Sequence, residues 1–381
     1  MKRSVILALQ YFTYFGILGL YLPYFTLYCH HIGFSAPEIG LLSANRMLAT
    51  AFFPILWGTL ADRTGRRKPL YISCTLLSAA VWLLFFTTDQ FLPMFLIMTA
   101  YGFFHAPLIA FIETFTMESL SHTPSAYGRI RVWGSISFIT FTLLFGAASE
   151  RAPGQHLIRW IAAGSLVQSM VSFTIPPSAE ARSRRFCPHA VITLFSGHMR
   201  LFLLAAFLML VSHGTYYGFF SIHLETLGFS PTFIGAAWAV ASVAEMGVMI
   251  GSRHLFYHIP LHRVLTGAFF VTLVRWLILW AAPSAAGIFV SQVLHAITYG
   301  AFHMATILYM DRYAPPGLKT IGQSTLNAVT FGLGMAAGFV INGLGYETLG
   351  GRMFLVSAGV ALAGAGCMLL SNRQVPNMPA P

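Results

Sequence analysis

The chain has 381 residues, of which 56% are hydrophobic and only 9% are charged. Soluble domains carry about 25% charged residues, so 22 basic and 11 acidic side chains are too few to cover a water-facing surface of this size. These numbers exclude a soluble enzyme, a disordered protein and a small disulfide scaffold. The net charge of +11 fits the excess of Lys and Arg in the cytoplasmic loops of membrane proteins better than nucleic-acid binding.

Twelve apolar stretches approach the ~20 residues that a membrane-spanning helix needs. In chain order they cover residues 5–28, 39–61, 69–87, 92–117, 129–149, 156–175, 201–224, 233–252, 264–282, 286–310, 321–344 and 351–371. Because the number of spans is even, both termini lie on one side of the membrane, and the loops on that side hold most of the basic residues. By the positive-inside rule this side is the cytoplasm. The sequence therefore predicts an all-α integral membrane protein with 12 transmembrane helices.

The longest polar connection lies between the sixth and seventh spans, over residues 176–200. It divides the chain into two predicted six-helix bundles, residues 1–175 and 201–381, which are joined by a cytoplasmic linker. Two six-helix halves related by a parallel repeat are a known transporter architecture, in which the substrate binds near the membrane midplane.

A short internal repeat supports this division. Residues 33–40 read GFSAPEIG and residues 228–235 read GFSPTFIG. Residues 101–105 read YGFFH and residues 299–303 read YGAFH. Both matches have nearly the same offset, and they relate the second span to the eighth and the fourth span to the tenth. The repeat therefore predicts two pseudo-symmetric halves.

The loop between the second and third spans carries an ordered motif, GTLADRTGRRKPL over residues 58–70. It resembles the signature of the major facilitator superfamily, G-x-L-a-D-r-x-G-r-k-x-x-l, at every defined position. A loop that only satisfied the positive-inside rule would need positive charge but not the ordered glycines and aspartate. The resemblance implies that the motif latches neighbouring helices and helps to set the equilibrium between inward-facing and outward-facing states. The motif residues are Gly58, Asp62, Arg63, Gly65, Arg66 and Arg67.

An ionisable side chain at the centre of a span costs about 2.5–3.5 kcal/mol on insertion scales, so its presence is a functional hypothesis. In chain order, the residues of this kind are Arg46, His105, Glu113, Arg129, Arg131, Glu245, Arg275, His295 and His303. At about 1.5 Å per residue, Arg275 and His295 lie near the midplane, and Glu245 lies about 10–12 Å from the cytoplasmic end of its span. We therefore expect these three side chains to meet.

In the first half, Glu113 and Arg131 enter from the cytoplasmic ends of consecutive spans, so we expect them to pair. Each candidate also has a structural interpretation. In that interpretation, Glu113 with Arg131, and Glu245 with Arg275, would form buried ion pairs that only neutralise each other's charge. His105 and His303 would be packing residues that hydrogen-bond a neighbour, and Arg46 would extend toward the membrane surface.

The start of the fifth span, YGRIRVWGS over residues 127–135, is similar to the F-G-R-x-R-x-x-G segment of lactose permease, a sugar/proton symporter. Glu245, Arg275 and His295 stand in the positions of that family's Glu, Arg and His. Glu113 and Arg131 resemble its substrate-gripping pair.

The sequence also departs from lactose permease. Phe138 stands where the permease has the Trp that stacks on the sugar ring, Gln292 replaces a Lys, and Thr298 replaces the proton-carrying Glu. These departures put a galactoside substrate, and the proton carrier of the permease, in doubt.

A resemblance over nearly the whole chain is to the 3-phenylpropionate (hydrocinnamate) permease group of the same superfamily. It rests on the segments YFTYF at 11–15, YGRIRVWGS at 127–135, YYGF at 216–219 and Gln292-x-x-His295-x-x-Thr298, followed by His303. It implies proton-coupled import of a small aromatic monocarboxylate through a bacterial cytoplasmic (inner) membrane by a monomer.

The sequence thus predicts a secondary active transporter that works by alternating access. The expected substrate-binding residues are Glu113, Arg131, Arg46, Phe138 and His105. The expected proton-coupling residues are Glu245, Arg275, His295 and His303. No cofactor, metal or nucleic acid is expected, the proton gradient is the energy source, and no catalytic motif indicates an enzyme. A proton-coupled sugar or nucleoside symporter is the alternative, and the compound, the proton stoichiometry and the direction of transport stay open.

Overall fold

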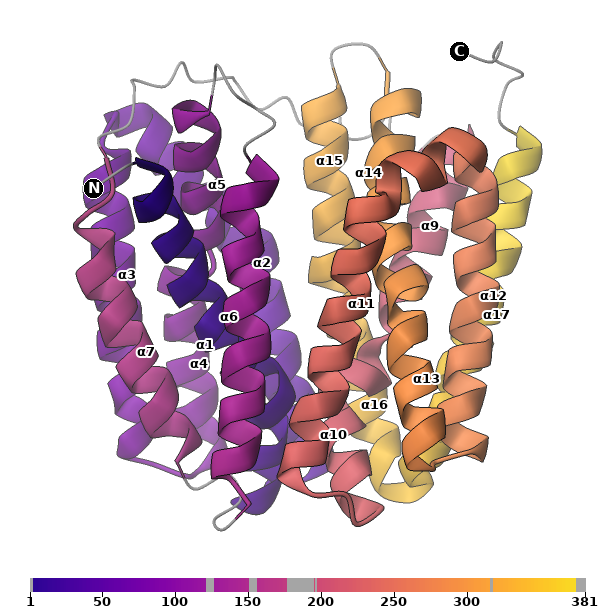
Figure 1. Cartoon of the computed structure of the whole chain (residues 1–381), viewed down its shortest axis with the longest axis horizontal. Helices are drawn as coiled ribbons and strands as arrows, with labels where there is room; N and C mark the ends of the chain where they lie inside the picture. Colours follow the sequence, from indigo (N-terminus) through magenta and orange to yellow (C-terminus); the bar gives the residue numbers. More distant parts are fainter. Residues whose placement is uncertain are drawn as a thin grey trace. The chain divides into compact units, whose positions relative to one another are not determined.

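A computed structural model of the chain describes residues 3–120, 127–150, 156–176, 195, 197–315 and 318–374. Within these ranges the chain forms helices and no strand, as Figure 1 shows. Most of the predicted linker, residues 177–194 and 196, lies outside the described residues.

The helices of the N-terminal part coincide with the first six predicted spans. They are α1 (Arg3–His31), α2 (Ala36–Thr64), α3 (Arg67–Leu83) with the short η1 (Leu84–Phe86), α4 (Phe91–His105), α5 (Leu108–Ser119), α6 (Tyr127–Ala148) and α7 (Leu157–Ser172). The fourth predicted span is divided into α4 and α5 by a turn at Ala106 and Pro107. Proline has no N–H to donate to the helix, which accounts for the break.

The helices of the C-terminal part coincide with the other six predicted spans. They are α9 (Gly197–Ser212), α10 (Gly214–Thr226), α11 (Pro231–His258), α12 (Leu261–Ala281), α13 (Ala285–His295), η3 (Ala296–Ala301), α14 (Phe302–Tyr313), α15 (Lys319–Asn327), η4 (Ala328–Gly334), α16 (Met335–Leu349), η5 (Gly350–Arg352) and α17 (Met353–Gln374). The seventh span breaks at His213, and the tenth and eleventh spans each contain a π-helical segment, η3 and η4. Such segments occur frequently at functional sites.

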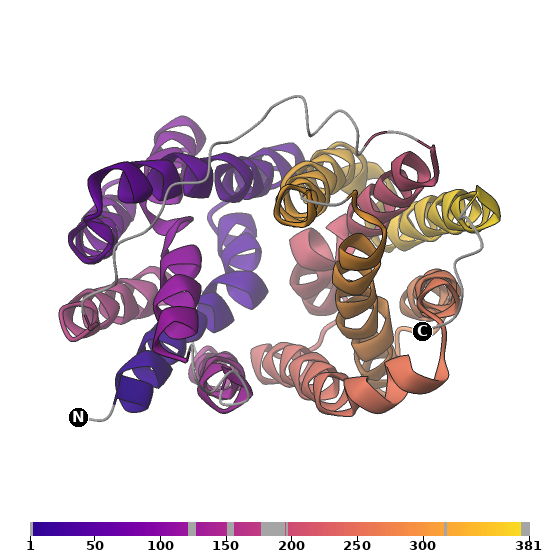
Figure 2. The ribbon, with the colours of Figure 1, turned by 90° about the horizontal axis from the view of Figure 1, so that it is seen from above.

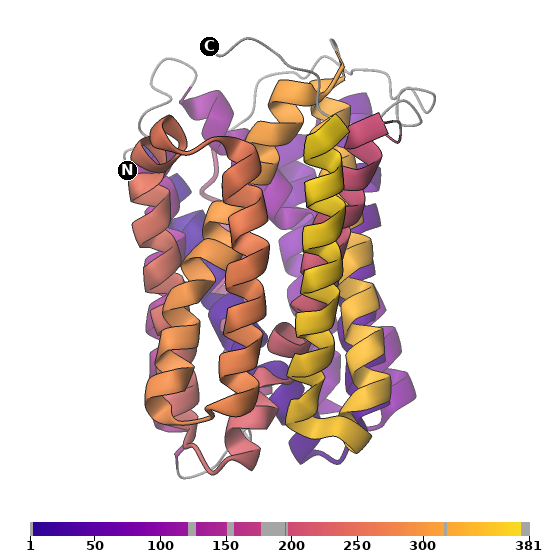
Figure 3. The ribbon, with the colours of Figure 1, turned by 90° about the vertical axis from the view of Figure 1, so that its right-hand side faces the viewer.

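Ten helical stretches among the described residues are long and apolar enough to cross a membrane. The last stretch, Ile321–Gln374, contains two spans, because a turn at Gly350 (φ +50°) separates α16 from α17 at the lower end of Figure 3. The remaining span is α7, which has 16 residues. The predicted all-α membrane architecture is therefore confirmed.

The chain divides into two compact units. The first consists of Met1–Arg184 and Tyr217–Ala239, and the second consists of Arg185–Tyr216 and Val240–Pro381. Figure 2 shows the helices of each unit close to end-on. The predicted halves place residues 217–239 in the C-terminal bundle instead, and that division stays a prediction.

The first internal repeat is a turn that ends one helix and starts the next in both copies. Gly33 and Gly228 have φ values of +93° and +84°, which residues with a Cβ rarely adopt. The backbone N–H groups of Phe34 and Phe229 each donate to the carbonyl five residues earlier at 3.0 Å, as in a Schellman motif. The serine that follows in each copy accepts a hydrogen bond from a backbone N–H three residues on and caps the next helix.

The second internal repeat lies at a helix irregularity in both copies. Tyr101 and His105 end α4 just before its break, and Tyr299 and His303 lie where η3 passes into α14. In each copy the tyrosine ring stacks on the imidazole four residues later. The ring centres are 4.7 Å apart at 23° in the first copy and 6.0 Å apart at 13° in the second. The two units therefore share the same local ring stack.

Candidate functional site

Arg275 on α12 is fully buried in the second unit. Its Nε donates to the backbone carbonyl of Ser291 at 2.8 Å, and its Nη1 donates to Thr298 Oγ1 at 3.2 Å. The guanidinium carbon lies 4.3 Å from the ring centre of Tyr216 and 4.6 Å from that of Trp276. Hydrogen bonds and ring faces together hold a cation where burial is costly.

His295 joins Arg275 to Glu245. Arg275 Nη1 lies 2.8 Å from His295 Nδ1, and His295 Nε2 lies 2.7 Å from Glu245 Oε1. A guanidinium only donates, so Nδ1 is the acceptor and the proton of the neutral imidazole is on Nε2, which donates to the carboxylate. The structure therefore brings together the three side chains that the depth argument expected to meet.

Glu245 is the accessible end of this chain. Its side chain is 20% exposed, whereas that of His295 is 3% exposed. Glu245 packs beside Gly300, where a Cβ would lie in ordinary van der Waals contact with its Cγ at 3.6 Å. A partly exposed acid is thus linked through an imidazole to a cation that is fully buried.

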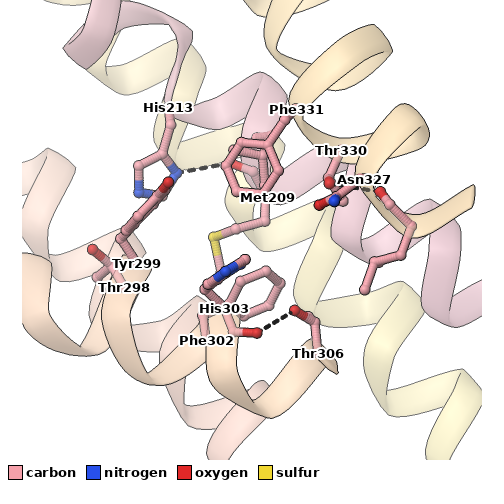
Figure 4. A pocket seen from close by; sticks show the side chains of 12 residues that line it. Met209, His213, Thr298, Tyr299, Phe302, His303, Thr306, Asn327, Thr330 and Phe331 are labelled. Atoms are coloured by element: carbon pink, nitrogen blue, oxygen red, sulfur yellow. Dashed lines mark hydrogen bonds between the residues drawn. The ribbon is translucent and has the colours of Figure 1, made fainter. Parts of the chain in front are cut away.

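Stacked rings continue from this cluster along the tenth span. Tyr299 stacks on His295 with ring centres 5.2 Å apart and on His303 at 6.0 Å. Tyr299 and His303 border a pocket, drawn in Figure 4, to which both π-helical segments contribute. Its polar lining consists of His213, Thr298, Tyr299, His303, Thr306, Asn327 and Thr330.

His213 is the residue of this region that the sequence argument missed. It is fully buried at the break between α9 and α10, and its Nδ1 lies 2.8 Å from the carbonyl of Met209. Its ring centre is 5.0 Å from Trp276 and 6.2 Å from His295. The signal was present in the sequence, because His213 is an ionisable residue inside the seventh apolar span, the criterion that selected His295.

Arg46 on α2 is the buried cation of the first unit. It is 7% exposed, and its guanidinium carbon lies 4.1 Å from the ring centre of Tyr21. None of the ion pairs among the described residues includes Arg46. The alternative in which this side chain extends to the membrane surface is wrong, because its guanidinium packs against Tyr21 instead.

The expected pair of Glu113 and Arg131 does not form among the described residues. Glu113 accepts hydrogen bonds from the Tyr127 hydroxyl at 3.1 and 2.9 Å. The guanidinium carbon of Arg131 lies 3.9 Å from the ring centre of Phe15 and 5.5 Å from that of Tyr11. The pairing was wrong because depth in the membrane does not specify in which direction around the helix axis a side chain points.

The other two expected substrate-binding residues are also buried in the first unit. His105, at the end of α4, lies between the rings of Tyr14 and Tyr101, with centres 5.2 and 4.7 Å away. Phe138 lies on α6, whose backbone approaches α1 closely at Gly19. The role of each of these residues stays a prediction.

The signature motif forms a charged link between three helices of the first unit. Arg67 at the start of α3 donates to Asp62 on α2 at 2.9 Å and forms a second ion pair with Glu118 on α5. Gly65 ends α2 with φ +65° and thereby allows the sharp turn. Gly58 lines a pocket of about 160 Å³ beside this link, whereas Arg63 and Arg66 are exposed.

The chain belongs to the MFS_1 like family, whose model matches residues 4–356. It is a transporter of the major facilitator superfamily and a multi-pass membrane protein, and the expected resemblance to that superfamily is confirmed. It is 27% identical over 376 residues to a probable 3-phenylpropionic acid transporter of Escherichia coli (strain K12), a match that covers 97% of this chain and 98% of the relative.

Two further similarities concern nucleoside transport. The chain is 22% identical over 369 residues to the putative nucleoside transporter YegT of Escherichia coli (strain K12), which covers 92% of this chain and 86% of the relative. The crystal structure of the nucleoside transporter NupG superposes with a TM-score of 0.86 at 18% identity, over 98% of this chain and 100% of that one. At this identity the structural match establishes the fold alone.

Proposed function

We propose that this transporter is a proton-coupled symporter that imports a small aromatic monocarboxylate, such as 3-phenylpropionate, by alternating access. It works as a monomer in a bacterial cytoplasmic membrane with both termini in the cytoplasm, and the proton gradient supplies the energy. The observation that carries the proposal is the hydrogen-bonded chain from Arg275 through neutral His295 to Glu245.

Coupling requires a group that is charged in one state and neutral in another. Glu245 fits, because its side chain is partly exposed while its hydrogen-bond partner is buried. With Glu245 ionised, the cluster has a net charge of zero. Protonation leaves the positive charge of Arg275 without a counter-ion in a setting of low dielectric, which favours a change of partners and attracts an anion.

The substrate class is supported by two observations. The relative with 27% identity is named a probable 3-phenylpropionic acid transporter. The first unit also places Arg46 and Arg131 against aromatic rings, with no acidic partner for either among the described residues. A monoanion that moves with one proton transfers no net charge, so its uptake would respond to the pH gradient and not to the membrane potential.

A nucleoside symporter is the second candidate, because two of the similar proteins are named as nucleoside transporters. A sugar symporter is a further alternative, given the resemblance of residues 127–135 to lactose permease.

Uptake into sealed liposomes tests these functions directly. Purified protein is reconstituted, an inward proton gradient is imposed, and labelled 3-phenylpropionate, uridine and lactose are supplied in parallel. Accumulation of the acid that collapses with a protonophore supports the proposal. Accumulation of uridine or lactose in its place supports the alternative substrate and retains the coupling. Uptake that is the same with and without the proton gradient contradicts symport.

A further inference from the structure

Arg46 is a buried cation without a protein counter-ion among the described residues. It lies ten residues from the start of α2, about 15 Å along the helix, and is 7% exposed. No described ion pair contains it. A charge at this depth requires compensation, and the ring of Tyr21, 4.1 Å from the guanidinium carbon, supplies only a part of it.

His105 provides a second, independent indication of a ligand at the same place. It is 4% exposed, and its Nε2 is buried without a hydrogen-bond partner among the described residues. Buried polar atoms in native proteins are almost always paired. The imidazole is held between the rings of Tyr14 and Tyr101, with interplanar angles of 17° and 23°, so its orientation is fixed.

Arg46 and His105 belong to one neighbourhood. The ring centre of Trp82 lies 6.3 Å from that of Tyr21, which faces Arg46. It also lies 4.8 Å from that of Tyr101, on which His105 stacks. This neighbourhood therefore combines a fixed cation, a neutral imidazole that can donate from Nε2, and three tyrosine rings. Those are the groups that would bind the carboxylate and the ring of an aromatic acid.

Arg131, the other candidate for the carboxylate, is in a different situation. Its side chain is only partly buried, near the beginning of α6, and its guanidinium lies over Phe15. Water can compensate its charge, whereas it cannot do so equally for Arg46. The need for an anion is therefore greater at Arg46.

We propose that Arg46 and His105 Nε2 form the subsite that binds the substrate carboxylate, with Tyr14, Tyr21 and Tyr101 as its aromatic wall. This inference rests on the proposed function and deepens it. A neutral nucleoside or sugar would leave Arg46 uncompensated, and a site built for one polar group discriminates strongly against ligands that lack it. The subsite therefore selects acids.

Equilibrium binding to the purified full-length protein tests this assignment without any gradient. The probes are 3-phenylpropionate and its neutral analogue 3-phenylpropan-1-ol. We expect Arg46→Gln to weaken binding of the acid about 10- to 100-fold, because the variant loses a charge-assisted hydrogen bond to the carboxylate. Binding of the alcohol stays nearly unchanged. Arg159→Gln, which removes an exposed charge on α7, is the matched control.

Two companion variants and one stability measurement separate binding from structure. His105→Ala should weaken binding of the acid more than binding of the alcohol. Arg131→Gln should weaken binding of the acid less than Arg46→Gln does. In the absence of ligand, Arg46→Gln should leave the Tm unchanged or raise it, because a buried uncompensated charge is removed. The subsite would be overturned if Arg46→Gln weakened the binding of acid and alcohol equally or strongly lowered the Tm without ligand. It would also be overturned if only Arg131→Gln lost the selectivity for the acid.

The outcomes distinguish this subsite from the proposed function. Arg46-dependent acid binding without proton-driven accumulation supports the subsite and contradicts symport. Binding of uridine or lactose but of neither acid nor alcohol overturns the subsite. Gradient-driven uptake of that neutral solute would then leave proton coupling in place.

Discussion

His295 Nε2 and Glu245 Oε1 lie 2.7 Å apart, and the two side chains differ sharply in exposure, 3% against 20%. Because Arg275 occupies the other imidazole nitrogen as a donor, His295 reaches Glu245 as a neutral hydrogen-bond donor. By distance alone the contact between His295 and Glu245 would be described as an ion pair. It is instead a hydrogen bond from a neutral imidazole, which joins a buried cation to a partly exposed acid. In the proposed mechanism, the change of protonation therefore occurs at Glu245, and His295 transmits it to Arg275.

The variant Glu245→Gln tests that assignment. Glutamine keeps the size of the side chain and can still accept from His295 Nε2, but it does not titrate. We expect proton-driven accumulation of substrate in liposomes to fall to the level of protein-free liposomes, whereas exchange of labelled for unlabelled substrate continues. Uptake and exchange are measured on the same preparation.

The matched control is Glu347→Gln, the same change at an exposed position of α16, which should retain both activities. Accumulation at the wild-type rate in Glu245→Gln would remove Glu245 from the coupling mechanism. Loss of exchange together with accumulation would indicate instead a role in binding or folding.

The sequence specified positions along the helices well. Apolar runs located all the spans, and a rise of about 1.5 Å per residue placed Glu245, Arg275 and His295 at similar depths. The structure brings those three side chains into contact. The turn glycines Gly33 and Gly228 were visible as a repeat, although their shared Schellman geometry was not.

The sequence did not specify rotation about the helix axes. Each residue added to a regular turn rotates the side chains that follow by about 100°, so a π-helical segment such as η3 changes which face they occupy. Nothing in the amino-acid pattern indicates that η3 or η4 is π-helical. For the same reason the depths of Glu113 and Arg131 did not predict that Tyr127 and Phe15 would be their neighbours.

The link between Asp62 and Arg67 leads to a second prediction. Asp62→Asn removes one of the two carboxylates that Arg67 holds, and so weakens the connection of α2 to α3 and α5. A partly exposed ion pair is worth about 0.2–1 kcal/mol, so we expect transport turnover to change by up to about fivefold. Substrate affinity at equilibrium should not change, because the motif is not part of the proposed binding site.

Turnover is measured from exchange rates, and affinity from equilibrium binding. Arg63→Gln, an exposed change within the same motif, should leave both quantities at wild-type values. Wild-type turnover in Asp62→Asn would argue against a conformational role for this link. An equal effect of Arg63→Gln would indicate that the net positive charge of the loop matters and not the ion pair.

Glu150 supplies a pH-dependent contribution to stability. The hydroxyl of Thr232, then the hydroxyl of Ser230, hydrogen-bond to its carboxylate and lower its pKa, and the backbone N–H of Thr232 donates to Oε1 at 3.2 Å. A carboxyl whose pKa is lower in the folded than in the unfolded protein stabilises the fold above the unfolded pKa. That contribution is lost as the pH falls through the folded pKa.

We therefore expect the Tm of the wild-type protein in detergent to exceed that of Glu150→Gln at neutral pH. The difference should narrow on acidification through the range in which carboxyl groups titrate. Glu38 is unsuitable as a control because its side chain is part of the cap of α2, so Glu347→Gln serves here too. A Tm difference that does not vary with pH would show that the Glu150 charge does not stabilise the start of α11.

Close packing of α16 against the seventh span gives a prediction about stability. Gly338 is buried, and a Cβ at this position would lie 2.7 Å from the backbone oxygen of Val211 and 3.1 Å from the Cα of Gly214. Backbone atoms cannot move aside as a flexible side chain does, so Gly338→Ala must separate the helices. Overpacking of this kind costs about 1–3 kcal/mol, and we expect a lower Tm and less folded protein after purification.

Gly366→Ala is the matched control, because Gly366 is an exposed helical glycine of α17 with no atom within 4 Å of the added Cβ. There alanine should be neutral or should stabilise the helix by up to about 1 kcal/mol, through its better helix propensity. Thermal unfolding of the two variants in the same detergent measures the contrast. Equal Tm values would mean that α16 and the break at His213 can separate at no cost, which would contradict a rigid contact between Gly338 and Gly214.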